Sequence, residues 1–135
     1  MKRILFIATE SAPGMIPYTS SVINALSKSN EFEIYAVVVN SGKRSYRNYL
    51  KEVEHIEYIE YPRSKLLKLI YKIYPARIID TIKRTAKTHK IDAIHLLTGD
   101  FCLFFYILCQ HPKERLYYTV HDLNQHESDL SLIHI

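Results

Sequence analysis

The chain has 135 residues, which is the size of one domain and too short for a two-domain enzyme. Apolar residues make up 47% of the sequence and charged residues 24%, a balance that indicates a globular protein and excludes a disordered chain. The formal net charge is +4, and no apolar run approaches the roughly 20 residues of a membrane-spanning helix.

Apolar runs alternate with amphipathic stretches along the whole chain. The runs at 4–8, 34–39, 56–61, 91–97 and 116–120 predict five strands. The stretches between them predict helices that begin near Pro17, behind Ser45, behind Ser64 and at Phe101. The helix behind Ser45 would carry Tyr46, Tyr49, Leu50 and Val53 on one face, and Pro75 would break or kink the helix behind Ser64.

This alternation predicts a single Rossmann-like domain at 1–135, with three α/β/α layers and a mainly parallel sheet of about five strands in the order 3-2-1-4-5. The topological switch point of such a sheet lies between its first and fourth strands. Ligands bind there, outside the carboxyl ends of the strands. The loops at 9–16 and 98–100 would therefore flank one crevice, with His121 on its rim.

The dipeptide His121-Asp122 is the most informative feature, because it follows an apolar strand directly and enters a polar loop. In the first loop, Gly14 would let the backbone approach a ligand just before a helix whose N–H groups attract phosphate. An ordinary turn explains Gly14 equally well, and Asp122 is at least as readily explained as a residue that orients its loop. The loop has no G-x-G-x-x-G fingerprint and no P-loop lysine, which argues against dinucleotide and nucleoside triphosphate binding.

Metal ligation is not expected. The sequence has no D-x-D pair, no H-E-x-x-H and no paired C-x-x-C motif, and we predict neither a metal nor another cofactor. His95 lies within an apolar strand and is interpreted as a core histidine with a hydrogen-bond partner.

Positive charge is concentrated between residues 63 and 90, which contain nine Lys or Arg and one acid, Asp80, a local balance of +8. Because the net charge of the chain is +4, the remaining residues together carry −4. Basic residues interleaved with Leu, Ile and Tyr suit an anionic membrane surface, although a solvated helix face is an equally good explanation. Nucleic acid is less favoured, because no binding motif accompanies the charge. The residues expected to face the membrane are Lys65, Lys68, Lys72, Arg77, Lys83 and Arg84.

Three segments together resemble one family. The first is the start MKRILFIATE with its glycine-containing loop, the second is IDAIH at 91–95, and the third is YTVHDLNQHE at 118–127. They are similar to the amino-terminal segments of family 4 glycosyltransferases, including a "D-x-I-H" strand and a "T-V-H-D-x-x-x-H" segment. The resemblance implies the acceptor-side domain of a retaining, metal-independent, hexosyltransferase-like enzyme of the GT-B fold. Such an enzyme transfers sugar from a nucleotide-sugar donor to a glycan or lipid-linked acceptor, as in polysaccharide biosynthesis.

By this resemblance His121 would touch the transferred sugar as the catalytic residue. Gly14, Met15, Thr98, Gly99 and Asp122 would bind the donor and substrate, with Gly14 at the donor diphosphate. Members of the family carry a second, donor-binding domain, which these residues do not supply. We therefore expect an incomplete enzyme half, inactive alone, that works in the cytoplasm or at the inner face of the membrane.

Two further expectations complete the prediction. The apolar segment at 130–135 should pack on something, and a second copy of the chain is one candidate. The alternative function is a stand-alone α/β ligand-binding or regulatory domain without catalysis. Titration with nucleotide sugars and flavins would separate the two functions.

Overall fold

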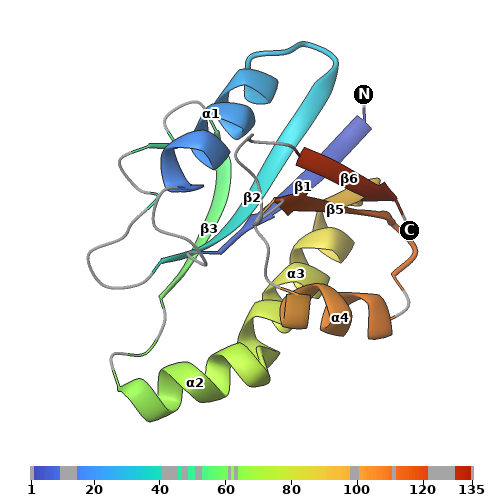
Figure 1. Ribbon diagram of the computed structural model, residues 1–135. Helices are drawn as coiled ribbons and strands as arrows, with labels where there is room; N and C mark the ends of the chain where they lie inside the picture. The colour runs from blue at the N-terminus through green and yellow to red at the C-terminus, as the bar shows by residue number, and fades with distance from the viewer. Residues whose placement is uncertain are drawn as a thin grey trace.

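The computed structural model describes residues 2–9, 15–40, 46, 49–50, 53–60, 62, 64–97, 101–110, 112–121 and 130–134. Its centre is a six-stranded sheet in the order β3-β2-β1-β4-β5-β6 (Figure 1). The strands are β1 Lys2–Ala8, β2 Phe32–Asn40, β3 His55–Glu60, β4 Ala93–Leu96, β5 Arg115–His121 and β6 Leu130–His134.

The first five strands are parallel and follow the predicted order 3-2-1-4-5, so the Rossmann-like α/β fold is confirmed. The sixth strand was not predicted. Residues of the apolar segment at 130–134 form β6, which pairs antiparallel with β5 and places Leu130 opposite His121. The segment expected to pack on something therefore extends the edge of its own sheet.

Four helices accompany the strands: α1 Met15–Ser27, α2 Lys65–Ile73, α3 Ala76–Thr88 and α4 Phe101–Cys109. Figure 1 shows α1 on one side of the sheet and α3 and α4 on the other, while α2 extends away from the sheet beyond α3. Pro75 separates α2 from α3, as expected, because proline cannot supply the N–H of a continuous helix. No helix among the described residues is long and apolar enough to cross a membrane.

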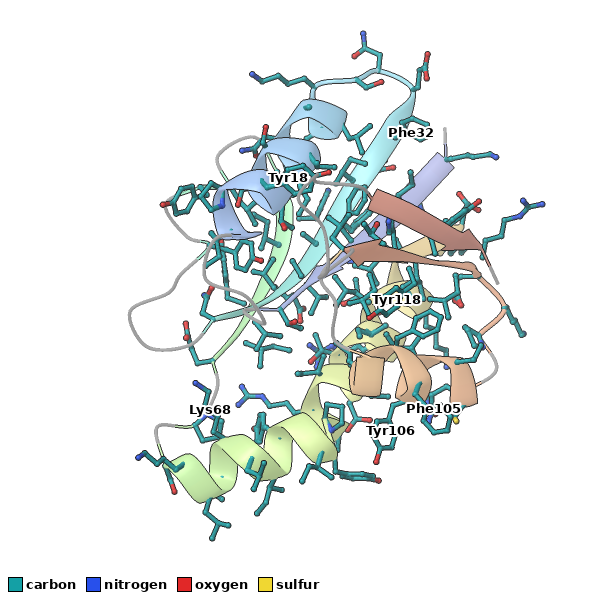
Figure 2. The ribbon with its side chains drawn as sticks, in the orientation of Figure 1. Tyr18, Phe32, Lys68, Phe105, Tyr106 and Tyr118 are labelled. Atoms are coloured by element: carbon teal, nitrogen blue, oxygen red, sulfur yellow. The ribbon has the colours of Figure 1, made fainter. Side chains whose placement is uncertain are left out.

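Alternation along the strands produces two hydrophobic cores. In β1, Leu5 and Ile7 belong to the core under α3 and α4, while Phe6 and Ala8 belong to the core under α1. Figure 2 shows Tyr118 between the sheet and α4, where its ring meets Phe104 edge-on with centroids 4.4 Å apart. Both faces of the central strands are thus buried, as in other parallel sheets covered by helices.

Asp92 aligns β4 with β1. Its carboxylate accepts a hydrogen bond from the Arg3 backbone N–H at 2.8 Å, and its own N–H donates to the Arg3 carbonyl at 2.9 Å. The Arg3 side chain also donates to Glu33 at 3.0 Å, which ties β1 to β2. The Asp of the D-x-I-H motif therefore has a structural role in this chain.

The helix predicted behind Ser45 is wrong at the residues that the structure describes. Tyr46, Tyr49 and Leu50 form a turn, in which the Leu50 N–H donates to the Tyr46 carbonyl at 3.1 Å. Tyr46 and Leu50 are nevertheless buried under α1. The i, i+4 spacing that predicted a helix thus brings Tyr46 and Leu50 to the core from a turn, in which the N–H groups of Tyr49 and Leu50 both donate to the Tyr46 carbonyl.

Candidate functional site

The strands β1, β4 and β5 are neighbours in the sheet and run in the same direction, so their carboxyl ends lie at one edge. Thr9 follows β1, Leu97 follows β4, and His121 is the last residue of β5. The chain reverses its direction of winding between β1 and β4, because β2 and β3 lie on one side of β1 while β4 and β5 lie on the other. This edge is where ligands bind in such sheets, and we call it the switch edge.

Hydrogen bonds hold the switch edge beside β1 and β2. The Tyr46 hydroxyl donates to the Thr9 carbonyl at 3.3 Å, and the Tyr46 N–H donates to Asn40 Oδ1 at 2.8 Å. Asn40 Nδ2 in turn donates to Glu60 Oε1 at 3.3 Å, at the end of β3. Because Thr9, Asn40 and Tyr46 are all buried, these bonds tie the ends of β1, β2 and β3 into one unit.

The amino terminus of α1 follows β1 and adjoins this edge. Its first turn contains no acidic residue, so no carboxylate within that turn offsets the partial positive charge of the helix end. The buried face of α1 carries Thr19 and Ser20, whose hydroxyl oxygens have no hydrogen-bond partner among the described residues. Burying a hydroxyl without a partner costs on the order of 1–3 kcal/mol, so these two groups require an explanation.

The structure places the predicted site residues unevenly. Met15 begins α1 and His121 ends β5, where we had expected the strand to end one residue earlier. Gly14, Thr98, Gly99 and Asp122 lie outside the described residues. The sheet topology nonetheless brings together the strand and helix ends to which these four residues are joined.

Thr19 and Ser20 were missed by the sequence analysis. The only signal in the sequence was a pair of small polar residues between Ile16 and Ile23, which mark the apolar stripe of the helix. Ser and Thr are common enough on helices that this signal carries little weight without the burial that the fold supplies.

His95 has the partner that the sequence analysis expected. Its Nε2 lies 2.6 Å from Thr119 Oγ1, and its ring contacts Phe6 with centroids 5.4 Å apart. Burial lowers the pKa of the His95 imidazole from 6.5 to about 4, because the apolar surroundings disfavour the charged form. A cavity of about 670 Å³ opens beside His95, on the α1 side of the sheet and near the amino ends of the strands. Tyr117 and Phe32 form part of its lining.

The basic residues of the predicted membrane surface lie in different environments. Lys65, Arg77, Lys83 and Arg84 are exposed, Lys68 is partly buried, and the side chain of Lys72 lies outside the described residues. Arg84 forms an ion pair with Glu57 at 2.8 Å, and Lys83 donates to Gln110 at 3.2 Å.

No group of three or more His, Cys, Asp or Glu side chains suited to a metal ion occurs within the described part of the chain. The sequence matches no model of a known protein family, and no curated protein is significantly similar to it. The class of protein that the structure defines is therefore a Rossmann-like α/β domain with a switch edge formed by β1, β4 and β5.

Proposed function

We propose that this chain is the acceptor-side domain of a retaining, metal-independent glycosyltransferase that uses a nucleotide-sugar donor. The observation that carries the proposal is the meeting of β1, β4 and β5 at one edge, with the amino terminus of α1 beside it. In the T-V-H-D segment, Thr119, Val120 and His121 lie in β5, and His121 is its last residue at this same edge. Sequence resemblance and topology thus point independently to one place.

The charge at α1 supports a diphosphate ligand. Backbone N–H groups at a helix amino terminus bind phosphate, and the first turn of α1 has no carboxylate to repel it. In this proposal Gly14 and Met15 lie against the donor diphosphate, while Thr98 and Gly99 bound the crevice across from them.

His121 is proposed as the catalytic residue, with Asp122 beside it. An imidazole at the end of β5 would donate a hydrogen bond to a hydroxyl of the transferred sugar or to the oxygen that gains charge as the diphosphate leaves. The acceptor would be a glycan or a lipid-linked sugar. No step of this chemistry requires a metal ligand from the described residues.

Amide chemical shifts of the isotope-labelled chain test the proposal. Addition of UDP-glucose or GDP-mannose at millimolar concentration should shift the amides of Thr9, Met15, Leu97 and His121. The amides of Glu33 and His55 lie at the opposite, amino-terminal edge of the sheet and should remain unchanged.

A matched pair of histidine variants sharpens the test. His121→Ala should weaken nucleotide-sugar binding at least about tenfold, a loss near 1.4 kcal/mol. The same change should alter the unfolding free energy by no more than about 0.5 kcal/mol, because the backbone pairing with Leu130 needs no side chain. His55→Ala, at the exposed amino end of β3, should leave nucleotide-sugar binding unchanged. Shifts produced by FMN but by no nucleotide sugar would favour the non-catalytic ligand-binding alternative. If no ligand shifts any amide at the switch edge, both functions are refuted.

A further inference from the structure

The short helix α2 has its amphipathic faces reversed relative to a helix packed on a core. Leu66 is 66% exposed and Ile73 is 58% exposed, whereas Lys68 on the same helix is partly buried. A helix of a soluble protein normally turns its apolar stripe inward. Figure 2 shows Lys68 on the side of α2 that faces the rest of the molecule. The exposed apolar residues of the helix are Leu66, Leu67, Leu69, Ile70 and Ile73.

Aromatic side chains continue this surface toward α4. Tyr74, at the end of α2, is 62% exposed and meets Tyr106 edge-on with ring centroids 5.6 Å apart. Phe105, its neighbour on α4, is 53% exposed. Figure 2 shows Phe105 and Tyr106 pointing from α4 away from the sheet. We name the set of α2 apolar residues with Tyr74, Phe105 and Tyr106 the α2 patch.

Cations border the α2 patch. Lys65 begins α2 and is exposed, and Lys83 lines a small pocket of about 160 Å³ together with Tyr74 and Tyr106. The surrounding segment at 63–90 holds nine basic residues and a single acid, Asp80. Arg84 is already paired with Glu57, and Asp80 lines the same small pocket as Lys83, whereas α2 itself contains no acidic residue.

We infer that the α2 patch docks the protein on an anionic lipid bilayer, with α2 lying in the interface plane. Leu and Ile would enter the acyl boundary, Tyr74 and Tyr106 would sit at headgroup depth with their hydroxyls in water, and the lysines would contact anionic headgroups. A second copy of the chain is a poorer occupant. Two symmetric α2 patches would bring basic borders against each other, and like charges juxtaposed across an interface are unfavourable. Docking of this kind does not depend on sugar transfer, so either proposal can fail without the other.

The chain contains no tryptophan, which permits a site-specific fluorescence test. Leu66→Trp places the only indole on the α2 patch, and Tyr18→Trp places it at an exposed position of α1, on the other side of the sheet. With vesicles of phosphatidylglycerol, the emission of Leu66→Trp should shift to shorter wavelength and become sensitive to bilayer-bound quenchers. The emission of Tyr18→Trp should stay unchanged.

Vesicle co-sedimentation of the unaltered chain supplies the affinity. Binding to phosphatidylglycerol should exceed binding to phosphatidylcholine at least about tenfold and should fall as salt is raised. Leu69→Ser combined with Ile73→Ser should reduce binding by a similar factor while leaving the unfolding midpoint almost unchanged, because both side chains are already exposed. Tyr18→Ser is the matched control and should retain binding.

Three results would overturn the inference. These are equal binding to both lipids, no binding to either, or a spectral shift at Tyr18→Trp without one at Leu66→Trp. A fourth is a concentration-dependent shift of Leu66→Trp without vesicles, accompanied by dimers in sedimentation velocity, which would assign the α2 patch to self-association instead.

Discussion

At the scale of residues, His95 is a histidine whose imidazole is largely removed from water. Its imidazole bonds Thr119 and packs beside Phe6, and burial brings its pKa to about 4. Above pH 6.5 the ring is neutral in both folded and unfolded chains, so its titration does not change the unfolding free energy there. Between pH 6.5 and 4 only the unfolded chain binds the proton, and the folded state therefore loses stability as the pH falls.

We predict that the unfolding free energy decreases by about 2–3 kcal/mol as the pH falls from 6.5 to 4 because of His95 alone. Urea unfolding at half-unit pH steps would measure this. His95→Gln keeps a polar partner for Thr119 but cannot titrate, so its stability should vary correspondingly less over the same window. His55→Gln, which replaces an exposed histidine, should keep the parent's dependence. Parallel curves for the parent and His95→Gln would contradict the assignment.

At the scale of elements, the described residues of the helix expected between β2 and β3 form a turn instead. Tyr46 is fully buried in that turn. Its hydroxyl donates a hydrogen bond to the Thr9 carbonyl, and its N–H donates to Asn40 Oδ1. The Tyr46 side chain thereby joins this turn to α1 through core packing and to the end of β1 through the hydrogen bond to Thr9. The switch edge depends on this contact, because Thr9 starts the loop that leads to α1.

Tyr46→Ala should destabilise the chain by about 3–5 kcal/mol, the usual cost of removing a buried aromatic ring. Tyr46→Phe should cost only about 1 kcal/mol, because it keeps the ring and loses one long hydrogen bond. Thermal and urea unfolding of the two variants, with exposed Tyr49→Ala as the control, would check this difference. Similar losses for Tyr46→Ala and Tyr49→Ala would show that the turn does not anchor the edge.

At the scale of the whole molecule, the sheet has two unequal sides. On one face, helices α3 and α4 pack over residues from all five parallel strands. On the other face, α1 packs mainly on β1 and β2. The cavity beside His95 and Tyr117 lies on the second face, over β4 and β5. The switch edge lies at one end of the strands, and α2, which carries most of the α2 patch, extends away from the sheet (Figure 1).

A sugar transferase of the proposed kind closes its active site between two domains, and the proposal assigns these residues to one of them. We therefore predict that the isolated chain does not transfer sugar, because most of the electrostatic stabilisation of the leaving diphosphate would come from the other domain. Release of labelled nucleotide diphosphate in the presence of lipid-linked acceptors would measure it. Turnover on the order of 1 per second or faster would show that the chain carries a complete site.

The sequence alone was sufficient for the layered architecture. The five parallel strands and the four described helices follow from runs such as Ile4 to Ala8 and from the apolar spacing of Ile78, Ile79 and Ile82, because a parallel sheet buried on both faces needs continuous apolar strands. The break at Pro75 was equally determined, since it depends on the covalent structure of one residue. The meeting of the carboxyl ends of β1, β4 and β5 at one edge was predictable from strand order alone.

Only the tertiary structure decided which surfaces face inward. The periodicity of α2 shows an apolar and a basic face, but it does not show that the apolar face is the one left exposed, because this depends on what packs beside the helix. Tertiary contacts also decided three other features. These are the pairing of β6 with β5, the burial of Tyr46 in a turn, and the lack of a described hydrogen-bond partner for the Thr19 and Ser20 hydroxyls. Each depends on contacts between segments far apart in the chain, whereas patterns within a sequence report local geometry.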